Sequence, residues 1–276
     1  MPELAEAEFY RKRWARAAAG ATIRSVRLHP AARVFRGAGG AALRRALTGA
    51  SWRGSAAAAK QLLFRFSGEL WLGIHLGMSG ELRVEPAGYA PGRHDHLVLG
   101  TGRYRLVFSD PRQFGRVLWH RGKDAPDWWT RIAPAILSGA FTVPAVAAYL
   151  QRRRRAPIKA VLLQQERFPG VGNWLADEIL WRAAIHPRRA AGSLRPAEVR
   201  RLWRECRRTC RQALAVIAGR GRALPPDPNA QIPDRWLFRH RWSPGGRDPR
   251  TGTPLAYGTV GGRTTCWSPA RQRLPR

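Results

Sequence analysis

The chain has 276 residues, which allows one large domain or two modest ones with a buried core. Hydrophobic residues make up 44% of it and aromatic residues 9%, a composition that excludes a disordered chain. Lysine and arginine number 49 against 18 aspartate and glutamate, so the formal net charge is +31. A surface this basic disfavours an ordinary metabolic enzyme and favours a polyanionic partner, most often nucleic acid. Composition leaves open a ribosome-associated or simply arginine-biased protein.

Only four of the basic residues are lysines, namely Lys12, Lys60, Lys123 and Lys159. Chemistry that prefers lysine should therefore fall on one of these positions. The three cysteines cannot form a disulfide framework in a chain of this length. No apolar run approaches the ~18 residues that span a membrane, and the first residues, MPELAEAEFYRKRW, are not a secretory signal. We expect a soluble, monomeric protein of the cytoplasm.

Strands dominate the pattern as far as about residue 135. A helix is predicted over Ala5–Ala17, which is rich in Ala, Glu and Arg. Residues 61–86 and 94–110 then show apolar alternation broken by Ser-Gly and Gly-Thr-Gly turns, which predicts successive antiparallel strands. The arginine run at 152–155 is typical of a solvated linker or helix end.

Residues 143–218 are predicted to be helical, because their apolar residues recur every three and four positions. A Pro-rich connection at 223–234 follows, and the last 45 or so residues predict short strands with Gly-rich turns. The resulting fold class is α+β. We expect three parts: a strand-rich domain with a leading helix at 1–135, a helical domain at 136–224 and a terminal β-hairpin at 225–276.

The start of the chain is the first candidate for chemistry. Removal of Met1 would expose Pro2, whose secondary α-amine would be a nucleophile, since α-amino groups have a pKa near 7.7–8.0. Its attack on a sugar aldehyde gives an iminium, an electron sink for elimination, and Glu3 could transfer protons beside it. Taken alone the pattern is weak, because many proteins begin Met-Pro without any catalytic reason.

A second candidate is the turn at Gly170–Asn173, which leads into a predicted helix. Its backbone N–H groups and the Asn173 amide could hold a DNA phosphate, assisted by the helix dipole. A helix–helix turn that simply needs glycine explains the same residues equally well.

Taken together, these features and several further motifs resemble the formamidopyrimidine-DNA glycosylase family, which includes the endonuclease VIII branch. The resemblance runs nearly end to end. Its motifs are PELAEAE (2–8), AAKQLLFRF (58–66), HLGMSGEL (75–82), HDH (94–96), DPRQFG (110–115), PIKAVLL (157–163), PGVGNWLADEIL (169–180), IHP (185–187) and VGGRTT (260–265). It implies an N-terminal β-sandwich with a leading helix, followed by a helix–two-turn–helix domain that ends in a β-hairpin finger.

The resemblance also implies roles for single residues. Pro2 would attack C1′ of the damaged nucleotide, Glu3 would exchange protons during ring opening, and Lys60 would contact the phosphate and lesion side of the catalytic site. Arg263 is assigned to the same site as a phosphate ligand. The remaining DNA-binding residues would be the wedge Met78, Arg112 and Phe114, which fills the gap left by the flipped base, and the phosphate ligands His94, Lys159 and Asn173.

Two alternatives stay open for these residues. Met78 is the only internal methionine and would also serve as a core gap-filler. His94 and His96 could form a metal pair on one strand face, but they lack a third ligand.

Two segments depart from the family pattern. Where the family's finger holds zinc with two Cys-x-x-Cys pairs, this chain has DPRT (248–251) and SPAR (268–271), so we expect a zincless finger and no cofactor. Trp236, Trp242 and Trp267 are candidates for the packing that replaces the metal. The loop that caps an oxidised purine in the family is shorter and different here, at 219–231.

The predicted function is a bifunctional DNA glycosylase and abasic-site lyase of base excision repair, acting on double-stranded damaged DNA. It would release an oxidised base, a purine rather than a pyrimidine, and cleave the backbone by β- and δ-elimination. The alternatives are an endonuclease VIII-like pyrimidine-lesion enzyme and a non-catalytic protein that binds damaged or structured DNA. An RNA-associated basic protein would leave Pro2, Glu3 and the wedge unexplained.

Overall fold

The computed structural model describes residues 2–221 and 223–274 and divides into two compact units. The N-terminal unit runs to Ile132 and includes Gly221–Leu224, and the C-terminal unit comprises Ala133–Arg220 and the chain from Pro225 onward. The three-part division drawn from the sequence stays a prediction. Among the described residues, no helix is both long and apolar enough to cross a membrane.

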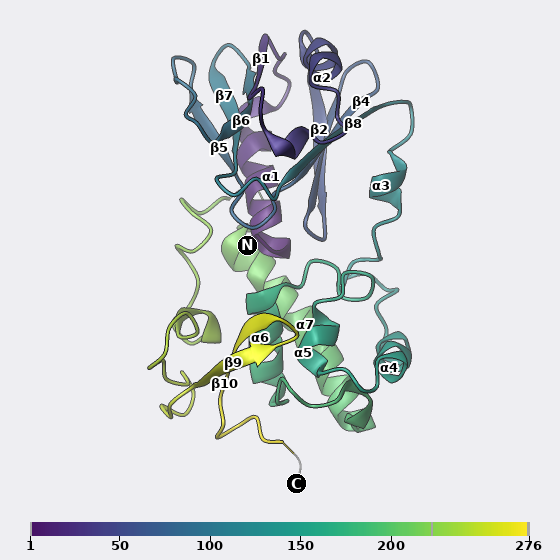
Figure 1. Ribbon diagram of the computed structural model, residues 1–276, viewed down its shortest axis with the longest axis vertical. Helices are drawn as coiled ribbons and strands as arrows, with labels where there is room; N and C mark the ends of the chain where they lie inside the picture. Colours follow the sequence, from purple (N-terminus) through teal and green to yellow (C-terminus); the bar gives the residue numbers. More distant parts are fainter. Residues whose placement is uncertain (1, 222, 275–276) are drawn as a thin grey trace. The chain divides into compact units, whose positions relative to one another are not determined.

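Two four-stranded antiparallel sheets form the frame of the N-terminal unit (Figure 1). One has the order β1-β6-β7-β5 and the other β2-β3-β4-β8. The strands are β1 (Ser25–Leu28), β2 (Trp52–Ala58), β3 (Gln61–Phe66), β4 (Leu70–His75), β5 (Glu81–Pro86), β6 (Asp95–Gly100), β7 (Tyr104–Ser109) and β8 (Arg116–Arg121). The strands bury Phe64 of β3, Ile74 of β4 and Phe108 of β7 in the core of the unit, and β7 is buried on both faces from Leu106 to Ser109. The β-sandwich predicted from the sequence is confirmed.

The leading helix α1 (Leu4–Ala18) contacts β5 and β7 of one sheet and β2 and β3 of the other. Trp14 anchors it: the indole is fully buried, lies 5.1 Å from the Phe64 ring and donates to the Arg83 carbonyl at 2.9 Å. Burial of this indole holds the helix against both sheets, since aromatic side chains contribute large apolar areas. The helix predicted over Ala5–Ala17 is confirmed.

Shorter elements complete the unit. They are η1 (Arg33–Phe35), α2 (Gly40–Leu47) and α3 (Asp127–Thr130). Helix α2 packs against β1, and η1 packs against β8.

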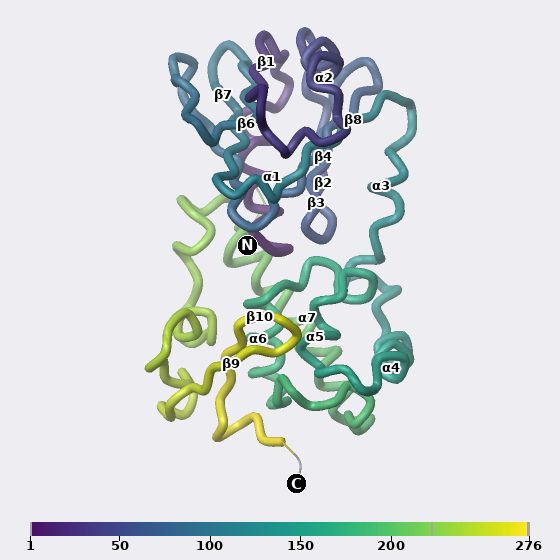
Figure 2. Tube along the Cα trace, viewed as in Figure 1, coloured from purple at the N-terminus to yellow at the C-terminus, as the bar shows by residue number. Residues whose placement is uncertain are grey.

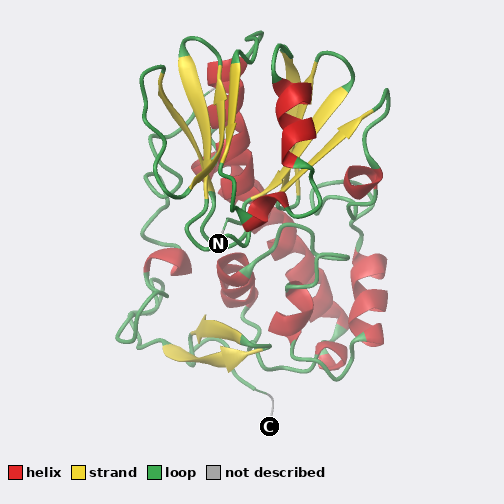
Figure 3. Cartoon of the chain, turned by 45° about the horizontal axis from the view of Figure 1, so that its top comes forward, coloured by secondary structure: helices red, strands yellow, loops and turns green. Residues whose placement is uncertain are grey.

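Helices dominate the C-terminal unit (Figure 3), as the spacing predicted. They are α4 (Val143–Arg152), α5 (Ile158–Leu162), α6 (Asn173–Ala183), η2 (Ala191–Ser193), α7 (Pro196–Ile217) and η3 (Leu237–Arg239). Helix α6 is buried on almost every side. Helix α7 buries one face and exposes arginines on its opposite face. Packing of α7 against α6 and α4 makes this unit's core.

A β-hairpin of β9 (Ala256–Val260) and β10 (Arg263–Trp267) follows and packs on α6. Trp181 of α6, Leu237, Leu255 and Cys266 form its buried cluster, with Tyr257 against them.

Candidate active site

Pro2 and Glu3 lie at the N-terminus of α1, where Glu3 is the capping residue. Pro2 is half-buried, whereas Glu3 is 1% exposed, and its N–H donates to Glu6 Oε2 at 3.1 Å. Ala5 and Ala7 in the first turns of the helix are fully buried. The helix start thus places the Pro2 nitrogen and the Glu3 carboxyl on adjacent residues of a rigid element, and removal of Met1 would turn that nitrogen into an amine.

Lys60 lies in the two-residue turn that joins β2 to β3 (Figure 2), after Ala59 at φ 53°. Its neighbour Gln61 pairs with His75 across β3 and β4. Burial lowers the pKa of His75, the charge of Lys60 lowers it further, and Asp110 offsets part of the shift. His75 Nδ1 accepts the Gly77 N–H at 3.1 Å. The sequence analysis did not single out His75; only the strand register brings it near Lys60.

The loop after β4 and the loop after β7 carry the three predicted wedge residues, and Asp110 joins the two loops. Its buried carboxylate accepts the Ser79 hydroxyl at 2.6 Å on Oδ1 and the Gly115 N–H at 2.7 Å on Oδ2. Gly77, at φ 64°, lies so close to the backbone of Phe114 that a Cβ there would be 2.5 Å from it. The two loops therefore form one rigid ridge.

The side chains on this ridge are available at the surface. Phe114 is 53% exposed, and the Arg112 guanidinium lies 4.9 Å from the centroid of its ring. Met78 is half-buried, so it is not enclosed in the core as a gap-filler would be. An apolar ring and a cation on a fixed ridge match the chemistry of a wedge.

His94 lies just before β6 of the β1-β6-β7-β5 sheet, whereas Lys60 lies in a turn of the other sheet. Its carbonyl accepts the Asp110 N–H at 3.1 Å, and its Nε2 lies 2.9 Å from Arg93 Nε. His96 is buried, with its Nε2 at 2.9 Å from the Asp110 carbonyl. No cluster among the described residues is suited to a metal, so the metal-pair alternative gains nothing.

Asn173, Lys159 and Arg263 belong to the C-terminal unit. Asn173 is the first residue of α6, and its Oδ1 is buried with no hydrogen-bond partner in the described part of the chain. Gln165 fixes the preceding turn: its Nε2 donates to the carbonyls of Leu163 and Val171 at 2.9 and 2.8 Å, and its Oε1 accepts the Gly170 N–H at 3.0 Å. The glycine turn is thus preorganised, and Gln165 is a residue that the sequence analysis missed.

Lys159 is fully buried, against the expectation of an exposed phosphate ligand. Its Nζ lies 2.7 Å from Asp177 Oδ1 and donates to the Thr264 carbonyl at 2.8 Å. Asp177 Oδ2 also accepts from Arg241 Nη2 at 2.6 Å and from the Cys266 N–H at 3.1 Å. In this arrangement Lys159 ties α5 to α6 and to β10, and it presents no atom to a ligand.

Arg263 opens β10 and is exposed. The turn before it consists of Gly261 at φ 59° and Gly262 at φ 72°, conformations that favour glycine. Gly261 lies against Ala160 of α5, because a Cβ there would be 2.7 Å from the Ala160 Cβ. The hairpin tip is therefore fastened beside Lys159, with Arg263 directed outward.

The finger contains a buried carboxylate where the family has its first cysteine pair. Asp248 is 1% exposed and accepts the Trp181 indole N–H at 3.1 Å. Burial alone would raise the pKa of Asp248, but the Ser268 hydroxyl, the Arg250 N–H, the indole and the charge of Arg271 lower it.

The guanidinium groups of Arg250 and Arg271 lie 4.6 and 4.9 Å from the Trp181 ring. The residues at the four family positions (Asp248, Thr251, Ser268 and Arg271) do not fit a four-ligand zinc site, since only the Asp248 carboxylate is of a usual ligand type and no thiolate or imidazole accompanies it.

Of the three tryptophans predicted to replace the metal, two are packed. Trp236 stacks on Trp174 at 6.4 Å, and Trp267 meets His186 edge to face at 5.3 Å. Trp242 is 62% exposed, although its ring meets Phe238 edge to face at 5.0 Å, so it contributes less buried area than the other two. Trp181, which the sequence analysis did not consider, occupies the centre instead.

The region of the capping loop, 219–231, is described except for residue 222. It forms no helix or strand in its described part, and Asp227 closes a turn by accepting the Asn229 N–H at 2.7 Å.

Two family models match most of the chain. The formamidopyrimidine-DNA glycosylase N-terminal domain matches residues 1–117, and the formamidopyrimidine-DNA glycosylase H2TH domain matches residues 132–222. The formamidopyrimidine-DNA glycosylase of Thermus thermophilus is 38% identical over 280 residues, covering 99% of this chain and 98% of that protein. The Laribacter hongkongensis protein of the same name is 37% identical over 222 residues, covering 78% and 79%.

Solved structures agree on the fold. Lactococcus lactis Fpg (MutM) in complex with DNA that contains an oxidised pyrimidine has a TM-score of 0.87 at 24% identity, covering 99% of this chain and 100% of that one. The Lactococcus lactis Fpg complex with abasic-site DNA has a TM-score of 0.84 at 24% identity and the same coverage. With both family models matched and a relative aligned over nearly its whole length, the chain belongs to the formamidopyrimidine-DNA glycosylase family.

Proposed function

We propose that Pro2 and Glu3 of this chain excise oxidised purine bases from duplex DNA and cleave the resulting abasic site. As a member of its family, the chain is a DNA-formamidopyrimidine glycosylase with abasic-site lyase activity in base excision repair, and damaged DNA is its partner. The cellular site of action is the bacterial cytosol, on nucleoid DNA.

The proposed reaction requires removal of Met1 and begins with the Pro2 nitrogen lone pair, which attacks C1′ as the bond to the base breaks. The base leaves with the proton that the Pro2 nitrogen releases. Glu3 protonates O4′ while the C1′–O4′ bond opens, which leaves an iminium between C1′ and the Pro2 nitrogen. Loss of a C2′ proton expels the 3′ phosphate, loss of a C4′ proton expels the 5′ phosphate, and water hydrolyses the iminium. No step transfers electrons to an acceptor, so no redox cofactor is required.

The observation that carries this proposal is the placement of Glu3. A carboxyl that is 1% exposed, on a residue whose own N–H is held by Glu6, keeps one position relative to the preceding Pro2. Such preorganisation is the main contribution a protein can make to a proton transfer. The exposed ridge of Arg112 and Phe114 supports a flipped-base substrate, since it can fill the gap that flipping leaves.

We also propose that no metal takes part. The support is the residue set of the finger, in which a carboxylate, two hydroxyls and a guanidinium occupy the positions of the family's zinc ligands.

Borohydride trapping on abasic-site DNA tests the proposal. The iminium should be reduced to a stable amine, and peptide mapping should find the DNA adduct on Pro2. Pro2→Gly should trap weakly, and Glu3→Gln should lose base excision while it retains much of the lyase step. An adduct on Lys60 would show that the nucleophile is wrong, and tight binding without trapping would favour a non-catalytic DNA-binding protein.

A panel of duplexes, each with a single defined lesion, tests the purine preference. Faster excision of oxidised pyrimidines than of 8-oxoguanine or formamidopyrimidines would support the endonuclease VIII-like alternative.

A further inference from the structure

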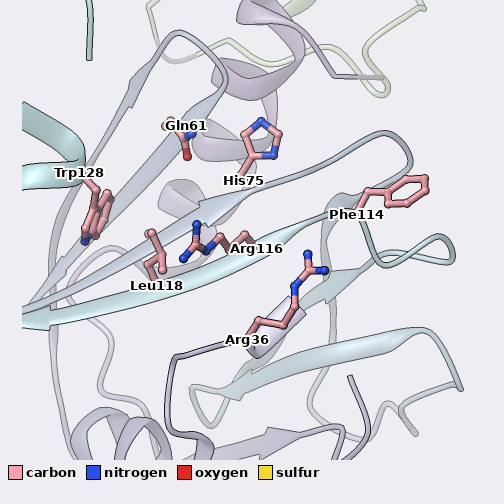
Figure 4. A pocket seen from close by; sticks show the side chains of 8 residues that line it. Arg36, Gln61, His75, Phe114, Arg116, Leu118 and Trp128 are labelled. Carbon is pink, nitrogen blue, oxygen red and sulfur yellow. The ribbon is translucent and has the colours of Figure 1, made fainter. Parts of the chain in front are cut away.

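A pocket of ≈ 350 Å³ lies on the face of the β2-β3-β4-β8 sheet away from its buried side chains (Figure 4). Its walls are Arg36, Gln61, Gly73, His75, Phe114, Arg116, Leu118 and Trp128. Strand register explains why these residues share one face, because His75 pairs with both Gln61 and Arg116 and Gly73 pairs with Leu118. Its volume falls within the range of small-ligand sites, about 300–1,000 Å³.

An aromatic ring closes one end of the pocket. The ring of Trp128 of α3 lies so close to β4 that a Cβ at Gly73 would be only 2.3 Å from it. Only a glycine at position 73 lets the indole come this close to the strand. The exposed part of the half-buried indole is thus a fixed surface on which a planar group can stack.

The rest of the pocket is cationic. Figure 4 shows the guanidinium groups of Arg36 and Arg116 directed into the space between Trp128 and Phe114. No ion pair in the described part of the chain involves either arginine. The positive charge of Lys60 also acts on His75 at the pocket wall. No carboxylate lines the pocket, so its charge calls for an anion.

Phe114 belongs to both the pocket and the ridge that carries the wedge residues. A nucleotide that the ridge deprives of its pairing partner would therefore lie beside the pocket entrance. We propose that this pocket holds one unpaired nucleotide of bound DNA, with its phosphate on Arg36 and Arg116 and its base stacked on Trp128. This inference rests on the proposed function, since it requires a duplex opened by the ridge.

The assignment of the phosphate to Arg36 and Arg116 is tested by measuring how tightly the protein binds a duplex with a stable abasic-site analogue at several salt concentrations. Arg36→Ala and Arg116→Ala should each raise the Kd about five- to tenfold and reduce the slope of log K against log salt by about one. Arg121→Ala is the matched control: it removes an exposed arginine from the same strand, but outside the pocket. If neither pocket variant differs from Arg121→Ala, the phosphate assignment is overturned.

The stacking half is tested with 2-aminopurine opposite the abasic analogue. Binding of the wild-type protein should quench its fluorescence, and Trp128→Leu should restore about half or more of the emission while the duplex stays bound. Equal quenching by both proteins would overturn the stacking assignment. A third result would also overturn the proposal. If the wild-type protein binds free deoxyadenosine monophosphate saturably, and Arg116→Ala abolishes that binding but leaves DNA binding unchanged, the pocket takes a free nucleotide.

Borohydride trapping by the wild-type protein separates this proposal from the proposed function. Trapping on Pro2 with unaltered binding by the pocket variants refutes the pocket alone. If no trapping occurs but the pocket variants bind DNA more weakly as expected, the catalytic proposal is refuted and the pocket proposal stands.

Discussion

The Nζ of Lys159 lies 2.7 Å from Oδ1 of Asp177, and both side chains are fully buried. Asp177 also receives Arg241 and the Cys266 N–H, so one carboxylate joins α5, α6, β10 and the segment before the hairpin. Breaking such a pair costs more than its net attraction, because the remaining cations stay buried without compensation. The hairpin that carries Arg263 therefore depends on Asp177.

Asp177→Asn should lower the free energy of unfolding by about 3–5 kcal/mol and weaken the binding of abasic-site DNA. The measurements are urea denaturation and a DNA-binding titration. Asp234→Asn is the control, since its side chain is 97% exposed, and it should change stability by less than about 0.5 kcal/mol. Equal effects of the two substitutions would contradict the structural role of Asp177.

Lys159 shows what the sequence could and could not supply. Its rarity marked it as a lysine with a role, and the family resemblance assigned it to phosphate. The partner Asp177 lies 18 positions away on another helix, and no local pattern pairs the two. Burial of a cation depends on a tertiary contact, which explains why the sequence alone suggested an exposed ligand.

Lys60 and His75 provide a prediction in the other unit. Burial and the charge of Lys60 lower the pKa of His75, so Lys60→Gln should raise it towards the ordinary value of 6.5. Titration of the histidine ring signals by NMR, assigned with a His75→Gln variant, measures the change. Lys123→Gln removes a lysine that exerts no such effect on His75, and it should leave this titration unaltered. An unchanged His75 pKa in Lys60→Gln would refute the coupling.

The histidines also show how much register matters. His94 was predicted from the HDH motif, whereas His75, the residue beside Lys60, begins a motif that drew attention only to Met78. The alternating pattern predicted strands β3 and β4 correctly, but alternation does not say which residues face each other. The wedge residues were predicted as a set, yet the Asp110 bonds that make their loops one ridge require the fold.

Chelation should leave both activity and thermal stability unchanged, because no thiolate or imidazole stands at the four positions where the family has cysteines. Asp248→Ala should instead lower the free energy of unfolding by about 1–3 kcal/mol, since it leaves the buried Trp181 indole N–H without its acceptor. Elemental analysis measures the metal content, and thermal denaturation with and without a chelator measures the stability of both proteins. Activity lost to the chelator and restored by zinc would refute a metal-free finger.

Glu198 should make stability depend on acid pH. Burial alone would raise its pKa, but hydrogen bonds from Arg189 and from Arg195 lower it to about 2. The unfolded chain binds this proton first as pH falls, so the stabilisation is complete above about pH 4.5 and is lost towards pH 2. Glu198→Gln should remove on the order of 2 kcal/mol at neutral pH and flatten the stability profile over that interval. Denaturation of both proteins from pH 2 to 7 measures how the free energy of unfolding depends on pH. Glu69→Gln is the control: it changes an exposed glutamate and should keep the wild-type profile.

Gln165 should control phosphate binding without touching DNA. Its amide makes three bonds to the backbone of the turn before Asn173, and two of them use the NH₂ group as donor. Gln165→Glu keeps the shape but removes both donors and brings a carboxylate against two carbonyl oxygens, so the turn should open. We expect the Kd for abasic-site DNA to rise about tenfold and the salt slope to fall by about one, because the groups at the start of α6 that are predicted to bind a phosphate would lose their alignment.

Gln151→Glu makes the same chemical change on the exposed end of α4, and it controls for the added negative charge. If Gln165→Glu weakens DNA binding more than Gln151→Glu does, and also reduces the slope of log K against log salt, Gln165 is a positioning residue. If Gln165→Glu destabilises the protein but preserves the wild-type salt slope, the glutamine serves the fold alone and the turn does not present Asn173 to a phosphate.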